Sequence, residues 1–258
     1  MNLNLDNKKV LITGASRGIG LAIAESFLKE GAKTCLISRG SNNLFENEKK
    51  LQDCYGFDNV FACKCDCTEV ESLKNLKEEV KDRWGDLDIV IVNVGDGGSV
   101  PAALPDDKQW QKTWINNFES ALQTARTFLP MLEKSKGCLL FISSIAGVEA
   151  FGAPTDYSTA KSAIIALAKN MARKLASVNV RVNVIAPGNV YFKGGSWDKK
   201  IQQDKQRVNQ IIKSTVPMNR FATPQEIADS AVFLCSDRAS FITGTTLVID
   251  GGQTVGVL

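Results

Sequence analysis

The chain has no histidine among its 258 residues. Ser-His and Cys-His nucleophilic catalysis need an imidazole base, so this absence excludes both reactions and also histidine-ligated metal sites. The seven cysteines include no Cys-x-x-Cys spacing of the kind that holds structural zinc. Cys63, Cys65 and Cys67 alternate along a predicted strand, which suits small buried side chains in a reducing compartment better than a metal site. We therefore expect no metal.

Extended apolar stretches are missing as well. No segment approaches the ~20 apolar residues of a membrane-spanning helix, and Met1–Asp6 has neither the basic flank nor the apolar core of a signal peptide. The formal net charge of +3 is too small to indicate a surface for nucleic acid or for a membrane. We expect a cytoplasmic protein that binds neither.

Short β-rich runs alternate with helical patterns along almost the whole chain. The strand runs are nearly continuously apolar, which is typical of a parallel sheet covered on both faces. This pattern predicts one α/β domain over residues 1–258, a Rossmann-type doubly wound parallel sheet of about seven strands with helices on both faces. The expected strands are Lys9–Thr13, Thr34–Ser38, Val60–Asp66, Ile89–Asn93, Cys138–Ser143, Arg181–Ala186 and Leu247–Ile249, and the expected helices are Gly18–Glu30, Asn43–Cys54, Val70–Trp84, Lys108–Glu133, Asp156–Ser177 and Pro224–Ser236.

Residues 189–217 interrupt this alternation. They contain no strand pattern, a Gly194-Gly195 pair, and then an amphipathic helix pattern that begins near Trp197. Long connections inside a compact domain are often lids, and we expect a substrate lid here. Basic residues outnumber acidic ones in this segment by six to two, which indicates either a solvated helix face or a lid that favours an anionic substrate.

A glycine-rich turn stands where the first strand meets the first helix: Thr13-Gly14-Ala15-Ser16-Arg17-Gly18-Ile19-Gly20. Glycines let the backbone approach a diphosphate closely, and a helix N-terminus supplies free N–H donors and a partial positive charge. The spacing differs from the Gly-x-Gly-x-x-Gly of the standard dinucleotide fingerprint. Its place between a strand and a helix nevertheless favours phosphate binding over a simple tight turn.

The second strand ends in Ser38-Arg39, without the acidic residue that binds a ribose 2′-hydroxyl in NAD-dependent proteins. Ser38, Arg39 and Arg17 can instead receive a 2′-phosphate, because guanidinium matches phosphate bidentately. The alternative is a pair of surface arginines. These residues predict NADP(H) as the cofactor.

Further polar or small residues follow strands on the same edge of the sheet. Asp66 closes the third predicted strand, where it either accepts a hydrogen bond from the adenine amine or caps the next helix. Asn93-Val94-Gly95 ends the fourth strand. This edge, at the carboxyl ends of the strands, is where open α/β sheets bind their ligands.

Tyr157 and Lys161 lie four residues apart in a predicted helix and therefore share a face. A phenol beside an ammonium indicates proton chemistry. Together with the phosphate-binding turn, the pair indicates a nicotinamide-dependent reductase.

Taken in order, these features resemble the classical short-chain dehydrogenase/reductase family over essentially the whole chain. Tyr-x-x-x-Lys alone is a weak signal, whereas the full set in this order and spacing is specific. Within the family, the 3-oxoacyl-[acyl-carrier-protein] reductases are the most broadly similar. The residues that carry the resemblance are the glycine turn, Asn93-Val94-Gly95, Asn117, Ser144, the Tyr157–Lys161 pair, Pro187-Gly188, and the closing Ile242-Thr243-Gly244 and Val248-Ile249-Asp250-Gly251-Gly252.

The resemblance implies hydride transfer between a nicotinamide and a carbonyl or alcohol. Tyr157 would be the general acid/base, and Lys161 would lower its pKa and bind the nicotinamide ribose. Ser144 would hydrogen-bond the substrate oxygen, and Asn117 would hold a water that links Lys161 to solvent. The rival positions for these last two roles are Ser143 and Asn116, which fit the family's spacing less well.

The sequence departs from the family pattern at two points. Val92 stands where a second asparagine is common, a change expected to affect packing rather than chemistry. No threonine follows Pro187-Gly188 to contact the cofactor, because Val190, Tyr191 and Phe192 stand there, and the backbone of Val190 is left to reach the amide. The predicted cofactor-binding set is Gly14, Ser16, Arg17, Gly18, Ile19, Gly20, Ser38, Arg39, Asp66, Cys67, Asn93, Gly95, Tyr157, Lys161, Pro187, Gly188 and Val190.

The resulting prediction is an NADP(H)-dependent oxidoreductase that interconverts a carbonyl and a secondary alcohol. Its substrate would be a 3-oxoacyl thioester, although Ser135 and Val178 occupy positions where carrier-protein reductases usually present a basic residue. The alternatives are a sugar, a sugar nucleotide or another anionic small metabolite and, more remotely, a non-catalytic dinucleotide-binding sensor. The resemblance also implies a homotetramer or a dimer.

Overall fold

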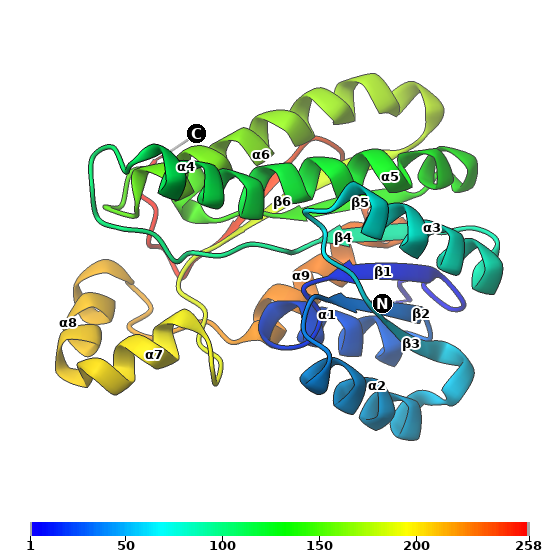
Figure 1. Cartoon of the computed structure of the whole chain (residues 1–258), viewed down its shortest axis with the longest axis horizontal. Coiled ribbons are helices and arrows are strands. Elements are labelled where there is room, and N and C mark those ends of the chain that lie inside the picture. The colour runs from blue at the N-terminus through cyan, green and yellow to red at the C-terminus, as the bar shows by residue number, and fades with distance from the viewer. Residues whose placement is uncertain (1, 257–258) are drawn as a thin grey trace.

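The computed structural model describes residues 2–256, and its centre is a parallel sheet of seven strands (Figure 1). The strand order is β3-β2-β1-β4-β5-β6-β7, as expected for a doubly wound sheet. This architecture confirms the predicted fold class. The strands are β1 (Lys9–Thr13), β2 (Lys33–Ser38), β3 (Val60–Lys64), β4 (Ile89–Val92), β5 (Cys138–Ile142), β6 (Arg181–Pro187) and β7 (Thr246–Ile249).

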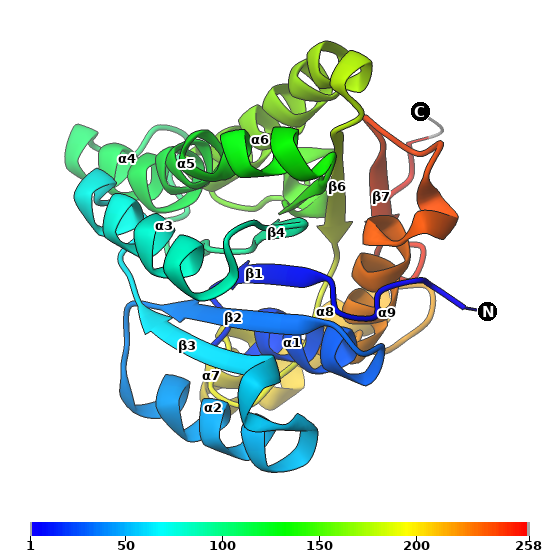
Figure 2. The ribbon, with the colours of Figure 1, turned by 90° about the vertical axis from the view of Figure 1, so that its right-hand side faces the viewer.

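Helices cover both faces of the sheet (Figures 1 and 2). The strand side chains are buried on both sides, which is why the strand sequences are apolar without alternation. Each face has its own apolar core, one that includes Phe27 and one that includes Phe128. One core packs against α1 (Gly18–Lys29), α2 (Asn42–Tyr55) and α9 (Pro224–Cys235), and the other against α3 (Val70–Trp84), α5 (Ser120–Ser135) and α6 (Thr155–Leu175).

The order of the strands reverses between β1 and β4. Ile12 of β1 pairs with Leu36 of β2 on one side and with Ile91 of β4 on the other. The connections that leave β1 and β4 therefore diverge, and open α/β sheets bind their ligands at the carboxyl ends of the strands beside such a reversal. The glycine turn follows β1, and Asn93 to Gly95 follow β4, so both predicted ligand-binding segments lie at this reversal.

The predicted helix Lys108–Glu133 has a more complex structure. α4 (Asp107–Trp114) continues through a π-helical turn, Ile115–Glu119, into α5. The backbone N–H of Ser120 donates to the carbonyl of Ile115, which is the i→i+5 bond of a π turn.

The segment 189–217 forms two helices where the sequence pattern predicted one. α7 (Ser196–Gln203) and α8 (Lys205–Thr215) project beyond the end of the sheet (Figure 1). They divide at Asp204, whose carboxylate accepts from the N–H of Arg207 and so starts a new helix. Val208 and Ile212 are buried, whereas all the lysines of α7 and α8 are exposed. This arrangement supports a solvated basic face.

The cysteines are free, and all except Cys54 are buried. Cys63, Cys65 and Cys67 lie in the same apolar core, as predicted, although β3 ends at Lys64 and only Cys63 belongs to the strand. No helix of residues 2–256 is long and apolar enough to span a membrane.

Phe128 is completely buried on α5, in the core that also holds α3 and α6. Replacement by alanine leaves a cavity under the sheet, and we expect Phe128→Ala to lower the free energy of unfolding by about 3–5 kcal/mol. Phe57, which is 69% exposed, is the matched control, and Phe57→Ala should change the value by less than about 0.5 kcal/mol. Urea unfolding of both variants measures the difference, and equal effects would contradict the described core.

Candidate active site

The glycine turn is shaped for close approach to its backbone. Gly14 and Gly18 have positive φ angles of 66° and 58°, which other residues rarely adopt. A Cβ on Gly20 would collide with the carbonyl oxygen of Gly14, so the first turn of α1 packs directly on the loop. The conformation of the turn itself requires these glycines, independently of any ligand.

Asn93 fixes this loop to the end of β4. Its backbone N–H donates to the Thr13 hydroxyl at 2.9 Å, and its Nδ2 donates to the carbonyls of Thr13 and Gly14 at 3.1 and 3.2 Å. The side chain predicted to contact the cofactor therefore holds the glycine turn in place. It joins the two segments that meet at the strand reversal.

The N-terminus of α1 is suited to a diphosphate. Arg17, its N-cap residue, makes no side-chain cap hydrogen bond, and the first turn contains no acidic residue. The free N–H groups of the first turn of α1, and the positive end of its dipole, therefore have no carboxylate of this helix beside them that would compete with a phosphate. With the glycine cradle, this arrangement fits the phosphates of a dinucleotide, with Ile19 at the second helical position.

Ser38 and Arg39 lie beside the glycine turn, as the prediction requires. The Ser38 hydroxyl donates to the Ser16 hydroxyl at 3.1 Å, and the exposed Arg39 guanidinium is 3.9 Å from the Asp66 carboxylate. These groups lie at the ends of β2 and β3. They form a polar rim with two exposed guanidinium groups, since Arg17 is exposed as well.

Asp66 does not cap α3, so that alternative is wrong. Its Oδ1 accepts from the N–H and hydroxyl of Thr68 at 2.9 and 2.8 Å in a local turn, whereas the N-cap residue of α3 is Glu69. Cys67 is only 2% exposed, and its side chain belongs to the core. Only its backbone is available for the predicted cofactor contact.

Phe192 covers the glycine turn. A Cβ built on Gly18 would lie 2.7–2.8 Å from three atoms of the Phe192 ring, so the ring packs directly on that glycine. The Arg17 guanidinium also donates to the carbonyl of Gly194 at 3.1 Å. The start of the segment 189–217 is thus held against the predicted phosphate site by a ring and a guanidinium. In the sequence, Phe192 stands out only as a departure from the family pattern.

Pro187 and Gly188 lie where β6 ends beside β7. Gly188 donates its N–H to the carbonyl of Ile249 at 2.9 Å, and a Cβ on Gly188 would meet the backbone of Asp250. Val190 forms an isolated bridge with Ala222 that uses the backbone groups of residues 189 and 191. The N–H and C=O of Val190 itself take no part in that bridge, which is consistent with the predicted contact to an amide.

Tyr157, Ser144 and Lys161 are brought together by α6 and the tight turn that follows β5. Lys161 lies one helical turn after Tyr157, and its Nζ is 5.8 Å from the centre of the tyrosine ring. The Ser144 hydroxyl lies close enough to the Tyr157 phenol to lower its pKa. The rival Ser143 is turned inward, and its hydroxyl donates to the carbonyl of Lys161 at 2.8 Å. The geometry therefore favours Ser144 as the hydroxyl available for chemistry.

The pKa shifts of this pair differ from the prediction. Burial raises the pKa of Tyr157 above its usual 10, the neighbouring Ser144 hydroxyl opposes the rise, and the negative charge of Asp96 adds to it. Lys161 is 3% exposed, and burial lowers its pKa from 10.5 to about 8. The predicted lowering of the Tyr157 pKa by Lys161 is wrong for the protein groups alone, because desolvation dominates and the ammonium donates to the carbonyl of Ile142.

Asn117 lies in the π-helical turn and is fully buried. Its Nδ2 donates to the carbonyls of Asp96 and Thr113, and its Oδ1 accepts from the N–H of Asp96 at 3.1 Å. A Cβ on Gly95 would stand 2.8 Å from Lys161 Nζ and 2.9 Å from Asn117 Oδ1. Asn117 therefore reaches the site as predicted, next to Lys161, through the backbone of the loop after β4.

The sequence pattern did not reveal a buried carboxylate beside Tyr157. Asp156 is 1% exposed and accepts from the Ser99 hydroxyl at 2.5 Å and from the N–H of Tyr157 at 2.9 Å. Burial alone would raise its pKa, but hydrogen bonds from Ser99, Thr113, Tyr157 and Gln109 lower it on balance. The signal in the sequence was its position directly before Tyr157. A single acidic residue there does not distinguish a buried charge from a solvated one.

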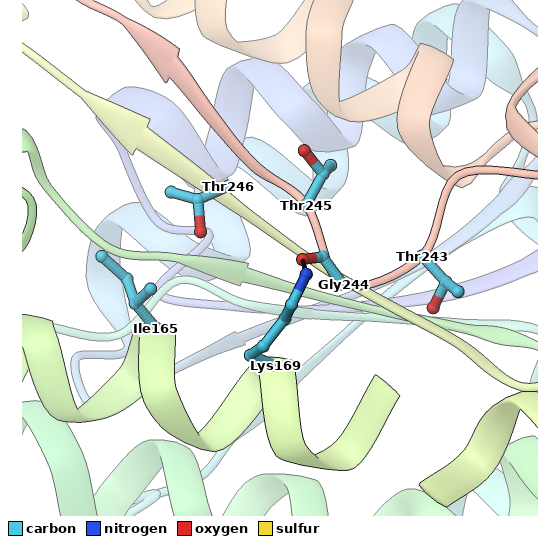
Figure 3. A pocket seen from close by; sticks show the side chains of 6 residues that line it. All are labelled: Ile165, Lys169, Thr243, Gly244, Thr245 and Thr246. Carbon is cyan, nitrogen blue, oxygen red and sulfur yellow. Dashed lines mark hydrogen bonds between the residues drawn. The ribbon is translucent and has the colours of Figure 1, made fainter. Parts of the chain in front are cut away.

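A surface pocket of about 450 Å³ lies elsewhere, between α6 and the start of β7 (Figure 3). It is lined by Ile165, Lys169 and the segment 243–246, and Lys169 donates to the Gly244 carbonyl at 2.8 Å. Lys169 lies two helical turns beyond Lys161. None of the groups of the candidate site lines this pocket.

The fold and the Ser144–Tyr157–Lys161 arrangement define an oxidoreductase class, and comparison with known proteins agrees. Residues 14–254 match a family model described as enoyl-(acyl carrier protein) reductase. The chain belongs to the short-chain dehydrogenase/reductase family, whose members interconvert carbonyl and alcohol groups with a nicotinamide dinucleotide.

The reported relatives cover nearly the whole chain. The uncharacterized oxidoreductase YvrD of Bacillus subtilis is 34% identical over 98% of both chains. The 3-oxoacyl-[acyl-carrier-protein] reductase FabG of Escherichia coli is 32% identical over 97% of this chain and 99% of its own. The structure of L-sorbose reductase from Gluconobacter frateurii, complexed with NADPH and L-sorbose, superposes with a TM-score of 0.93 at 31% identity over 100% of both chains.

Replacement of Lys161 by methionine tests the cost of its buried charge. At pH 7 the lysine is protonated in the folded and the unfolded chain, so the folded state bears the desolvation cost. Between about pH 8 and 10.5 the folded protein loses this proton first, and stability rises with pH. We expect Lys161→Met to raise the free energy of unfolding at pH 7 by up to about 3 kcal/mol. The variant should also lack the increase in stability between about pH 8 and 10.5.

Urea unfolding at pH 7 and pH 9.5 measures both effects. Lys174→Met, on the exposed side of the same helix, is the control and should leave the pH dependence unchanged. Destabilisation by Lys161→Met at pH 7 would show that its hydrogen bond to Ile142 outweighs the desolvation cost.

Proposed function

We propose that this protein is an NADP(H)-dependent reductase that interconverts a ketone and a secondary alcohol, with Tyr157 as the general acid/base. The observation that carries the proposal is the convergence of Ser144, Tyr157 and Lys161 at the carboxyl edge of the sheet. These groups adjoin a glycine turn and a helix N-terminus suited to phosphate. A non-catalytic sensor would not require the intact set.

Each group has a role that follows from its surroundings. Tyr157 is protonated near neutral pH, because burial and Asp96 raise its pKa, and it can give its proton to a carbonyl oxygen that becomes an alkoxide. Ser144 donates to the same oxygen and stabilises the developing charge. Lys161 returns a proton to Tyr157 and binds the ribose of the nicotinamide. The nicotinamide supplies the hydride when it is bound. The Lys161 pKa of about 8 suits exchange of a proton near neutrality.

The preference for NADP(H) rests on the rim beside the glycine turn. Arg17 and Arg39 are exposed there, and the Ser38 hydroxyl lies 3.1 Å from that of Ser16. No acidic residue ends β2 to bind a free 2′-hydroxyl. A 2′-phosphate would meet two guanidinium groups and replace Asp66 as the partner of Arg39. The NADPH bound to L-sorbose reductase is consistent with this preference.

For the substrate we propose a small neutral ketone bearing hydroxyl groups. L-sorbose reductase matches the full length of the chain, including the segment 189–217. The second candidate is a 3-oxoacyl thioester, suggested by the relationship to FabG. Against it, the Ser135 hydroxyl donates inward to the carbonyl of Leu87 at 2.7 Å, and the exposed Val178 is apolar, so neither position presents a cation to an acidic carrier protein.

We further propose that residues 189–217 act as a lid over one continuous domain. Phe192 and Gly194 connect this segment to the glycine turn, so its movement would accompany binding of the cofactor. A homotetramer, with a dimer as the alternative, and a cytoplasmic location remain part of the proposal. The seven free cysteines are consistent with a reducing compartment.

Tyr157→Phe removes the proton donor while retaining the ring. We expect kcat/KM for NADPH-dependent reduction of a panel of ketones to fall by about 10²–10⁴-fold. The control is Tyr55→Phe on α2, which should retain full activity. Turnover of Tyr157→Phe at the wild-type rate would refute the assignment of Tyr157.

Arg39→Ala tests the choice of cofactor. Loss of one charge-assisted contact to the 2′-phosphate should raise the KM for NADPH by about 10–100-fold and leave the KM for NADH almost unchanged. The exposed Arg126 on α5 provides the matched control, Arg126→Ala. Equal changes for the two cofactors would mean that Arg39 does not read the phosphate.

A further inference from the structure

The loop after β4, residues 95–99, runs along the candidate active site and is held at both ends. At one end, the backbone N–H and C=O of Asp96 are both bonded to the side chain of Asn117, at 3.1 and 3.0 Å. At the other end, the Ser99 hydroxyl donates to the buried Asp156 carboxylate at 2.5 Å. Asn117 and Asp156 are almost completely buried, so the loop has a defined position.

Asp96 lies between two glycines that border the site. A Cβ on Gly95, the residue before it, would stand 2.8 Å from Lys161 Nζ. A Cβ on the next residue, Gly97, would stand 4.0 Å from Cε2 of the Tyr157 ring. Asp96 Oδ1 accepts from the N–H of Gly98 at 2.9 Å, while Oδ2 has no hydrogen-bond partner within residues 2–256. Asp96 is exposed, so this oxygen is open to a ligand. A negatively charged residue with one free carboxylate oxygen thus lies in the loop that borders Tyr157.

The other charged groups around Tyr157 are already bonded within the protein. On its own helix, Lys161 donates to the carbonyl of Ile142, and Asp156 accepts from Ser99 and from the backbone of Tyr157. The turn after β5 contributes the neutral Ser144. Asp96 is the charge of the neighbouring loop that acts on the phenol.

We infer that Asp96 is a specificity-determining residue, whose carboxylate disfavours substrates with a negative charge next to the reacting carbonyl and accepts a hydrogen bond from a neutral substrate's hydroxyl. The inference rests on the proposed function, because it takes Tyr157 as the proton donor to that carbonyl. Asp96 would thus favour neutral hydroxyketones and disfavour small carboxylate or phosphate substrates. Like charges about 4 Å apart repel by about 1 kcal/mol in water and by more where water is excluded, which is enough to change selectivity by about tenfold.

The basic residues of the segment 189–217 do not oppose this conclusion. Lys199, Lys200 and Lys205 are exposed on α7 and α8, and Lys200 lies over the ring of Trp197 at 4.4 Å. Charge close to the reacting atoms affects the transition state more than charge on a solvated helix face, because water and salt screen the latter.

Asp96→Asn removes the charge and retains an oxygen that can accept from Gly98. The probes are 3-oxobutanoate and its ethyl ester, which have the same ketone and differ in charge, together with the neutral hydroxyketone dihydroxyacetone. We expect the wild type to prefer the two neutral ketones, and Asp96→Asn to lower the ester-to-acid ratio of kcat/KM by about tenfold. Asp82→Asn, at an exposed position on α3, should leave the ratio unchanged.

A second measurement does not depend on turnover. The chain has only three tyrosines, so the absorbance change on phenol ionisation can be assigned to Tyr157 by subtraction of the Tyr157→Phe titration. Removal of a neighbouring negative charge stabilises the phenolate, so Asp96→Asn should lower the pKa of Tyr157. In the active enzyme, loss of reduction at alkaline pH should begin at a lower pH.

The outcomes separate the inference from the proposed function. An unchanged ratio in Asp96→Asn overturns the specificity role, whatever the titration shows. If the wild type reduces none of the three ketones, the proposed function fails, and the titration then decides whether Asp96 acts on Tyr157. An unchanged titration in that case overturns the inference too, and a lowered pKa supports the placement of the charge.

Discussion

A positive charge buried against the end of the sheet constrains the whole candidate site. Lys161 is almost inaccessible to water, and its ammonium has a backbone carbonyl, that of Ile142, as its hydrogen-bond partner. Burial of a charge is costly, and the surrounding structure must be rigid to maintain it. Gly95 has no space for a side chain beside the ammonium, and Ser143 is bonded to the backbone of the same lysine. The buried lysine therefore constrains Gly95 and Ser143 whether or not a ligand is bound.

The end of β4 connects the two halves of the site. Asn93 bonds to the glycine turn, whereas Asp96, three residues later, is bonded through its backbone to Asn117 near Lys161. A shift of this short segment would therefore disturb the phosphate-binding turn and the proton-transfer groups together. The coupling follows from the strand order, because β4 lies beside β1 at the point where the sheet reverses.

The sequence predicted the sheet well because its strands are apolar on both faces and separated by clear helical patterns. It also predicted Lys161 as a neighbour of Tyr157, since residues four apart share a face of a helix, whereas Ser144 followed from the resemblance to the family. It could not predict the sign of the Tyr157 pKa shift, because desolvation depends on residues distant in the chain. The roles of Phe192 and Asp156 were hidden for the same reason, as each depends on a partner far away in sequence.

The π turn at Ile115–Glu119 has an implication for the evolution of the site. Such a turn is equivalent to one residue inserted into an α-helix. The side chains of α5 therefore point in directions about the helix axis that differ from those of a continuous α-helix. Deletion of a single residue here would restore a continuous α-helix and rotate everything beyond it by about 100°. Asn117 could then no longer reach the backbone of Asp96 while α5 kept its apolar side on the core. Length changes within these five residues should therefore be tolerated much less than side-chain substitutions on the outer surface of the same helix.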